Sequence, residues 1–129
     1  MMMFPTALRT SPLHGVGVFI LAPVKKGEVV WRFDSRVDRI YTETEILGMP
    51  SVAQAHLRKY AFWHKPTGHW MYCGDNARHF NHSEQPTAVS TSAGFGDDVA
   101  ARDLMPGDEL TNDYRMSCDM VATTGQLYR

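Results

Sequence analysis

Glycine and proline interrupt this chain at short intervals along its whole length, which limits each regular element to a few residues. The 129 residues include 10 glycines and 7 prolines. Even the longest apolar run, Val16 to Val24, is broken by Gly17 and Pro23, so it is far too short to span a bilayer. The spacing predicts many short strands joined by turns.

Six short segments are predicted to be strands, several of them rich in β-branched and aromatic residues. They are residues 17–22, 28–33, 60–63, 69–72, 99–102 and 109–111. The segments 60–63 and 69–72 flank the Lys65–Gly68 turn, so we expect them to pair as a hairpin.

A helix-start signal lies at Thr42, because Glu45 three residues later completes a capping box. The helix that begins there is expected to end before Pro50, and a second helical piece is expected over residues 51–57. Together these elements predict a mostly β domain with one or two short helices, in the α+β class.

Composition narrows the classes of function. The length suits a single domain, residues 1–129, with a modest core. A net charge of −1, with scattered Lys and Arg, gives no electrostatic reason to expect nucleic-acid binding. The first residues lack the basic and apolar regions of a secretory signal, so we expect a soluble, cytoplasmic protein, or a nuclear one in a eukaryote.

The cysteines do not suggest a disulfide framework or a metal site. Cys73 and Cys118 are too few for a four-cysteine zinc site. The spacing of Cys73 with His69, His79 and His82 matches no common zinc site either, so no metal is predicted.

Two segments near the C-terminal end point to a function. Residues 81–86 place five polar residues and a proline in six positions, which is too polar for a buried strand. Residues 107–114 follow a turn and end with an acid and a tyrosine, Asp113 and Tyr114.

Four segments resemble, in order, the motifs of the SET domain, the fold of protein lysine methyltransferases. They are the glycine motif Gly15–Phe19, the turn Pro23–Val30, the Asn-His-Ser segment Ala77–Pro86 and the Gly-Asp-Glu-Leu segment Ala100–Tyr114. The likeness covers roughly residues 12 to 116 and leaves a short tail, 117–129. The last two motifs are the specific ones.

The resemblance implies the SET β-clip, in which small curved sheets surround a C-terminal pseudoknot that brings Asn81 and His82 beside Tyr114. It also implies S-adenosylmethionine as cofactor and a lysine amine as methyl acceptor. An amine attacks only when it is neutral, and free lysine has a pKa of about 10.4. Desolvation in a narrow aromatic channel lowers that pKa.

The resemblance assigns roles to individual residues. Tyr114 would be the catalytic residue, with a hydroxyl that orients the amine. Residues expected to contact the cofactor are His14, Gly15, Val16, Gly17, Arg78, Asn81, His82, Tyr114 and Tyr128. The substrate channel is expected to include Phe33, Tyr72, Phe95 and Asn112, with Trp63 and Trp70 as further candidates for its walls.

Structural interpretations stand beside these roles. Asn81 and His82 can be a turn asparagine and a backbone-bonded histidine, and Arg78 can pair with an acid such as Asp113. Most aromatic residues in so small a chain belong to the core.

The sequence also departs from the family pattern at several positions. The cysteine that follows Asn-His-Ser is Glu84 here, and the asparagine that follows the proline is Thr87. Phe33 stands where an active-site tyrosine is common, and Asn112 stands where an aromatic residue often limits the number of methyl groups added.

The predicted function is therefore S-adenosylmethionine-dependent protein lysine N-methylation, with a protein or peptide that presents lysine as partner. One alternative is a SET-like module that binds cofactor or peptide without turnover. Another is methylation of a non-protein amine. We also expect that the domain can form a homodimer, because a minimal domain can need a second copy to complete its substrate groove. No membrane partner is predicted.

Overall fold

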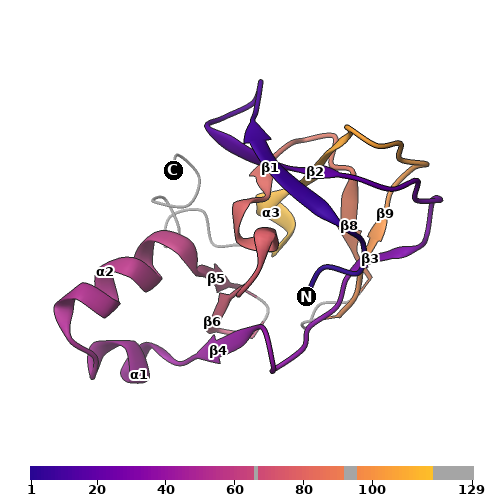
Figure 1. Cartoon of the computed structure of the whole chain (residues 1–129). Coiled ribbons are helices and arrows are strands. Elements are labelled where there is room, and N and C mark those ends of the chain that lie inside the picture. Colours follow the sequence, from indigo (N-terminus) through magenta and orange to yellow (C-terminus); the bar gives the residue numbers. More distant parts are fainter. Residues whose placement is uncertain (66, 92–95, 118–129) are drawn as a thin grey trace.

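The computed structural model describes residues 1–65, 67–91 and 96–117, which form short strands with a few helices (Figure 1). The helical elements are α1 (Glu43–Leu47), α2 (Ser51–Tyr60), the 3₁₀ helix η1 (Asn76–His79) and α3 (Tyr114–Ser117). The strands are β1 (Thr6–Thr10), β2 (Val16–Ile20), β3 (Val29–Trp31), β4 (Arg39–Tyr41), β5 (Phe62–His64), β6 (His69–Tyr72), β7 (Asn81–His82), β8 (Ala88–Ser90), β9 (Asp98–Ala100) and β10 (Glu109–Asn112).

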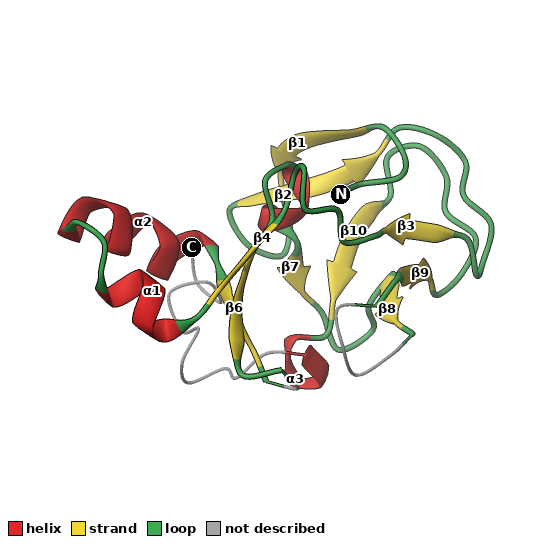
Figure 2. Cartoon of the chain, turned by 90° about the horizontal axis from the view of Figure 1, so that it is seen from below, coloured by secondary structure: helices red, strands yellow, loops and turns green. Residues whose placement is uncertain are grey.

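The strands form three small sheets, with orders β1-β2-β10-β7, β3-β9-β8 and β4-β6-β5. Their pairs are antiparallel except for β7 with β10, which run parallel. Both views place α1 and α2 at one end of the molecule beside the β4-β6-β5 sheet, with the other two sheets toward the opposite end (Figures 1 and 2).

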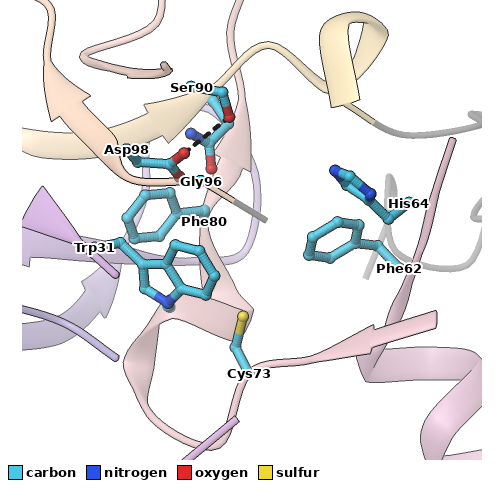
Figure 3. Close-up of a pocket in the computed structure, with 10 residues that line it drawn as sticks. Trp31, Phe62, His64, Cys73, Phe80, Ser90, Gly96 and Asp98 are labelled. Carbon is cyan, nitrogen blue, oxygen red and sulfur yellow. Dashed lines mark hydrogen bonds between the residues drawn. The ribbon is translucent and has the colours of Figure 1, made fainter. Parts of the chain in front are cut away.

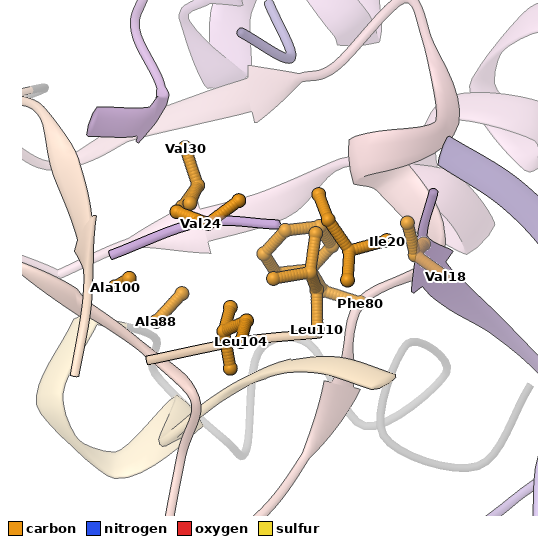
Figure 4. Close-up of a cluster of buried hydrophobic side chains, with 9 residues drawn as sticks. All are labelled: Val18, Ile20, Val24, Val30, Phe80, Ala88, Ala100, Leu104 and Leu110. Carbon is orange, nitrogen blue, oxygen red and sulfur yellow. The ribbon is translucent and has the colours of Figure 1, made fainter. Parts of the chain in front are cut away.

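The main core lies between the β1-β2-β10-β7 and β3-β9-β8 sheets, because the two sheets turn their apolar residues toward each other. Val18 and Ile20 alternate along β2 and are fully buried. The other core members come from segments scattered over the sequence (Figure 4): Val24, Val30, Phe80, Ala88, Ala100, Leu104 and Leu110. A second cluster, around Ile46, Leu57, Ala61 and Trp70, packs α1 and α2 onto β6.

The elements with local sequence signals are where they were expected. The capping box is present, since Thr42 Oγ1 accepts from the Glu45 N–H and Glu45 Oε1 accepts from the Thr42 N–H, both at 3.1 Å. Strand 69–72 and the strand beginning at residue 109 are also confirmed. None of the described helices is long and apolar enough to cross a bilayer.

Other boundaries differ from the prediction. The second helix runs to residue 60 instead of 57, so the strand predicted over 60–63 occupies 62–64. The segment 99–102 is a strand only over 98–100. Strands β1, β4, β7 and β8 were not anticipated, because two to five residues paired with distant segments carry little local pattern.

Gly17 is required by close packing. A Cβ at this position would lie 2.4 Å from Glu109 Oε2 and 3.0 Å from the Ser11 Cβ, whereas one at Gly48 would make ordinary contacts of 3.5 Å and 3.7 Å with the Glu45 and Thr44 carbonyls. Gly17→Ala is therefore expected to lower the free energy of unfolding by about 1–3 kcal/mol. Gly48 has a helical φ of −78°, so Gly48→Ala should be neutral or slightly stabilising. Urea denaturation measures both, and equal stabilities for the two variants would contradict this packing argument.

Candidate active site

The two polar segments singled out in the sequence lie side by side as the parallel pair β7–β10. Thr111 is in register with Asn81, and Asn112 with His82. The Ser83 N–H donates to the Asn112 carbonyl at 2.9 Å and continues the ladder. The predicted meeting of these segments is confirmed.

Thr87 holds this pair from the far side of β10. Its hydroxyl accepts from the Thr111 N–H at 2.9 Å and donates to the Glu109 carbonyl at 2.8 Å. The Thr87 N–H donates in turn to the Thr111 hydroxyl at 3.1 Å. Because these groups are buried, each bond satisfies a polar atom that would otherwise be costly to desolvate.

Tyr114 begins α3, one residue beyond the end of β10, and is only 7% exposed. Its hydroxyl donates to the backbone carbonyl of Phe80, the residue before β7. Its own N–H donates to His82 Nδ1 at 3.0 Å, and the two rings pack with centroids 5.4 Å apart. Both ends of the tyrosine are thereby fixed to the Phe80–His82 segment.

His82 therefore contributes its ring to the structure. Because Nδ1 accepts a hydrogen bond, the neutral ring carries its proton on Nε2. Asp113 lies 3.7 Å from Nδ1 but is bound by Arg115 at 2.7 Å, and this guanidinium holds the pKa of Asp113 below its usual range.

The suggested pair between Arg78 and Asp113 is wrong. Arg78 donates to the Tyr72 hydroxyl at 2.8 Å and lies over the Tyr60 ring at 5.3 Å, since η1 faces the end of α2. His56 also contacts the Tyr72 hydroxyl, at 2.9 Å. Arg78 and Tyr72, predicted for different half-sites, thus belong to one cluster of cationic and aromatic side chains.

On the other side of β7, the Asn81 side chain holds the loop before β2. Its Nδ2 lies 3.0 Å from the His14 carbonyl, 3.2 Å from the Val16 carbonyl and 2.9 Å from Glu109 Oε2. Gly15, between these two carbonyls, has φ of +46°, a conformation that glycine adopts without strain. The loop His14–Val16 is thus shaped by one amide.

Glu109 and Ser11 complete this arrangement and were missed by sequence reasoning. The Ser11 hydroxyl donates to the Glu109 carboxylate at 2.8 Å and accepts from the Leu13 N–H at 3.0 Å. The carboxylate fills the space beside Gly17, so the missing side chain at Gly17 makes room for Glu109. Glu109 lies within the recognised Gly-Asp-Glu-Leu motif, but no local pattern distinguishes Ser11 from other loop serines.

The buried side chain of His14 bears on cofactor binding. Its Nε2 is buried and has no hydrogen-bond partner among the described residues. Buried polar atoms are normally paired, so an orphaned nitrogen beside a loop of exposed backbone groups suits a ligand with hydrogen-bonding groups. Of the residues predicted to contact S-adenosylmethionine, His14, Gly15, Val16 and Asn81 lie together on this side of β7, and their polar groups fit such a ligand.

A pocket with an empty volume of about 510 Å³, counting its open mouth, lies on the opposite side. Trp31 and Phe80 face Phe62 and His64 across it (Figure 3). The remaining described lining residues are Cys73, Ala77, Ser90, Gly96, Asp98 and Asn112. Trp31 is the second residue whose buried side-chain nitrogen, Nε1, lacks a partner among the described residues.

Asp98 is the one carboxylate in this pocket wall among the described lining residues. Burial raises the pKa of Asp98 to about 6, against smaller opposing effects of hydrogen bonds from Ser90 and Asn112. The Ser90 hydroxyl donates to Asp98 Oδ1 at 2.8 Å. Sequence reasoning did not select Asp98, because nothing in its own strand distinguishes it from the neighbouring Asp97.

The predicted channel residues are not brought together. Asn112 lines the pocket, but Phe33 and Tyr72 are not among its described lining residues. Phe33 packs beside Trp31, Met71 and Cys73. Trp63 and Trp70 stack edge to face in the cluster below α1 and α2, with ring centroids 5.6 Å apart. Phe95 and Tyr128 lie outside the described residues. Within the described part of the chain, no three His, Cys, Asp or Glu side chains gather as metal ligands would.

Comparison with known protein families identifies the family to which this fold and these motifs belong. The family model described as "SET domain" matches residues 15–115, about three quarters of the chain. The chain belongs to the SET-domain family. No match was found among curated proteins.

Solved structures share the SET fold at low sequence identity. A Plasmodium falciparum protein assigned as a histone methyltransferase is 20% identical, with a TM-score of 0.57, and the match covers 86% of this chain and 93% of that one. Polycomb Repressive Complex 2 of Chaetomium thermophilum, bound to the inhibitor GSK126, is 18% identical, with a TM-score of 0.67 over 94% of this chain. The same complex bound to S-adenosylmethionine is 21% identical, with a TM-score of 0.63 over 86% of this chain. The SET domain described here spans only 17% and 15% of those two Polycomb chains.

The Asn81 amide should be indispensable to this SET domain. In Asn81→Asp a carboxylate oxygen would face the Glu109 carboxylate and two carbonyls, so we expect a loss of about 3 kcal/mol in unfolding free energy. Asn76→Asp is the control, because Asn76 Nδ2 donates to the Thr6 hydroxyl, which can turn to donate in its place. Chemical denaturation at pH 7 compares the two, and similar losses would contradict the assignment.

The stability of the domain is expected to depend on pH through the ionisation of Asp98. Its folded-state pKa of about 6 exceeds the ordinary 3.8, so the folded state binds the proton more tightly and stability falls as pH rises between these values. Asp98→Asn removes that cost, and its advantage over the wild type should grow to on the order of 2 kcal/mol between pH 4 and pH 7. Melting temperatures across this range test the expectation.

The neighbouring Asp97, which is bound by Arg32, provides the opposite control. Arg32 holds the pKa of Asp97 below its ordinary value, so its ionised form stabilises the fold. Asp97→Asn should therefore gain no stability relative to the wild type as the pH is raised. If the stability difference between Asp98→Asn and the wild type does not change with pH, Asp98 is not desolvated in the folded protein.

Proposed function

We propose that this SET domain transfers a methyl group from S-adenosylmethionine to the side-chain amine of lysine in a protein or peptide. The observation that carries the proposal is the position of Tyr114, whose hydroxyl is held at the Phe80 carbonyl. Phe80 lines the aromatic pocket, and the next residue, Asn81, shapes the His14–Val16 loop on the other side. Through Phe80 and Asn81, Tyr114 is linked both to the pocket wall and to this loop, which supports a role for it between donor and acceptor.

The donor would bind beside the loop that Asn81 holds. Its candidate contacts are the backbone of Gly15 to Gly17 and of His82, together with His14 Nε2, which has no partner among the described residues. When bound there, S-adenosylmethionine supplies a methyl group activated by the positive charge of its sulfonium. The role of this chain is to orient that group and to exclude water from it.

The acceptor lysine would enter the pocket between Trp31 and Phe62. Apolar walls favour the neutral amine over the ammonium, which is the change that an attacking lysine needs. Since the Tyr114 O–H is used as a donor to Phe80, its oxygen can face the substrate only as an acceptor. It would therefore receive an N–H of the amine and aim the nitrogen lone pair toward the methyl group.

Replacing the tyrosine hydroxyl tests this role. Tyr114→Phe is expected to lower kcat for methyl transfer about 100-fold through lost orientation, while the Kd for S-adenosylmethionine stays within about threefold. Transfer of labelled methyl groups to histones, ribosomal proteins or total lysate gives the rate, and calorimetry gives the Kd. Tyr41→Phe, in the helical cluster, is the control and should be fully active. A fully active Tyr114→Phe would rule out the assignment.

A cofactor- or peptide-binding module without turnover is the second candidate. Asn112 favours it, because a polar amide lines the pocket where many SET enzymes carry an aromatic ring. Tight cofactor binding by the wild-type protein, with no methylated lysine in any protein offered, would support this candidate over the enzyme.

A further inference from the structure

We propose that Asp98 is the anchor for the positively charged end of a substrate side chain in the pocket, and that it selects a primary alkylammonium such as that of lysine. The identity of the substrate rests on the proposed function. The anchor itself rests on the contents of the pocket wall.

Asp98 has no counter-charge in the part of the chain that the structure describes. Among the described residues it forms no ion pair, and its polar neighbours Ser90 and Asn112 are uncharged donors. The adjacent acid, Asp97, shows the contrast, since it is bound by the Arg32 guanidinium through two bonds of 2.8–2.9 Å. A half-buried carboxylate held only by neutral groups is electrostatically incomplete, and a bound cation would complete it.

The walls around this carboxylate suit an alkyl chain. Trp31 and Phe80 lie on the same side as Asp98, opposite Phe62 and His64 (Figure 3). Aromatic faces pack well against methylene groups. The combination of apolar walls with one carboxylate fits a cation on a flexible apolar stem. It disfavours carboxylate and phosphate groups, which Asp98 would repel.

The position of Asp98 relates it to the reacting centre. Asn112, at the end of β10, lines the pocket together with Asp98 and lies two residues before Tyr114, the first residue of α3. Asp98 would thus hold the side chain in the charged form that prevails in solution, close to the place where the neutral form reacts. It is a substrate-binding residue and not the base of the reaction.

Binding of a lysine peptide library, compared with its norleucine counterpart, tests the anchor. The fluorescent peptides carry one central lysine, or isosteric uncharged norleucine, with randomised flanks, and Kd is measured by anisotropy in the presence of S-adenosylhomocysteine. The wild type should bind the lysine library at least about tenfold more tightly than the norleucine library. Asp98→Asn should reduce this preference below about threefold, and Asp97→Asn should retain it. Melting temperatures confirm that the variants are folded.

The outcomes separate the anchor from the enzymatic function. A wild type without lysine preference, or an Asp98→Asn variant that keeps it, overturns the anchor. Methyl transfer is measured on the same lysine library. Lysine preference without transfer overturns the proposed function and leaves the anchor standing, whereas transfer with an unchanged KM in Asp98→Asn overturns the anchor alone.

Discussion

The parallel pairing of β7 with β10 is the interaction on which the rest of the site depends. It joins segments about 30 residues apart through the register of Thr111 with Asn81 and Asn112 with His82. A two-residue strand cannot sustain this pairing alone, so the buried Thr87 hydroxyl bonds the backbone of β10 from its other side. Loss of this register would separate Tyr114 from Phe80 and Asn81 from the loop before β2.

Successive groups along residues 80–82 point to opposite sides of β7, so this short strand contributes to both half-sites. The Phe80 carbonyl and the His82 ring turn toward Tyr114, while the Asn81 side chain turns toward His14 and Val16. Successive side chains of an extended segment point to opposite faces. The polar composition that made this segment unlike a core strand therefore reflects its position between two half-sites, where each polar atom has a specific partner.

The sequence predicted the features that depend on local chemistry and missed those that depend on register. The Thr42 capping box and the Asn-His-Ser segment carry their meaning within a few residues. Glu109 and Asp98 acquire theirs only through pairing, Glu109 by filling the space beside Gly17 and Asp98 by facing the pocket beside Ser90. Tyr72 was assigned to the channel as one of several aromatic candidates for its walls, but its hydroxyl contacts Arg78 and His56.

The polar groups that the fold leaves incomplete lie on the two sides of β7. His14 Nε2 and Trp31 Nε1 are buried without partners among the described residues, and Asp98 is desolvated without a cation. Each costs stability that an apolar residue of similar size would restore. Strain of this kind elsewhere in a small domain would be hard to tolerate, since the whole fold is stabilised by only about 5–15 kcal/mol. Incomplete polar groups in the loop before β2 and in the pocket wall suit a site that ligands complete, because binding would then supply the hydrogen bonds and the charge that folding alone does not.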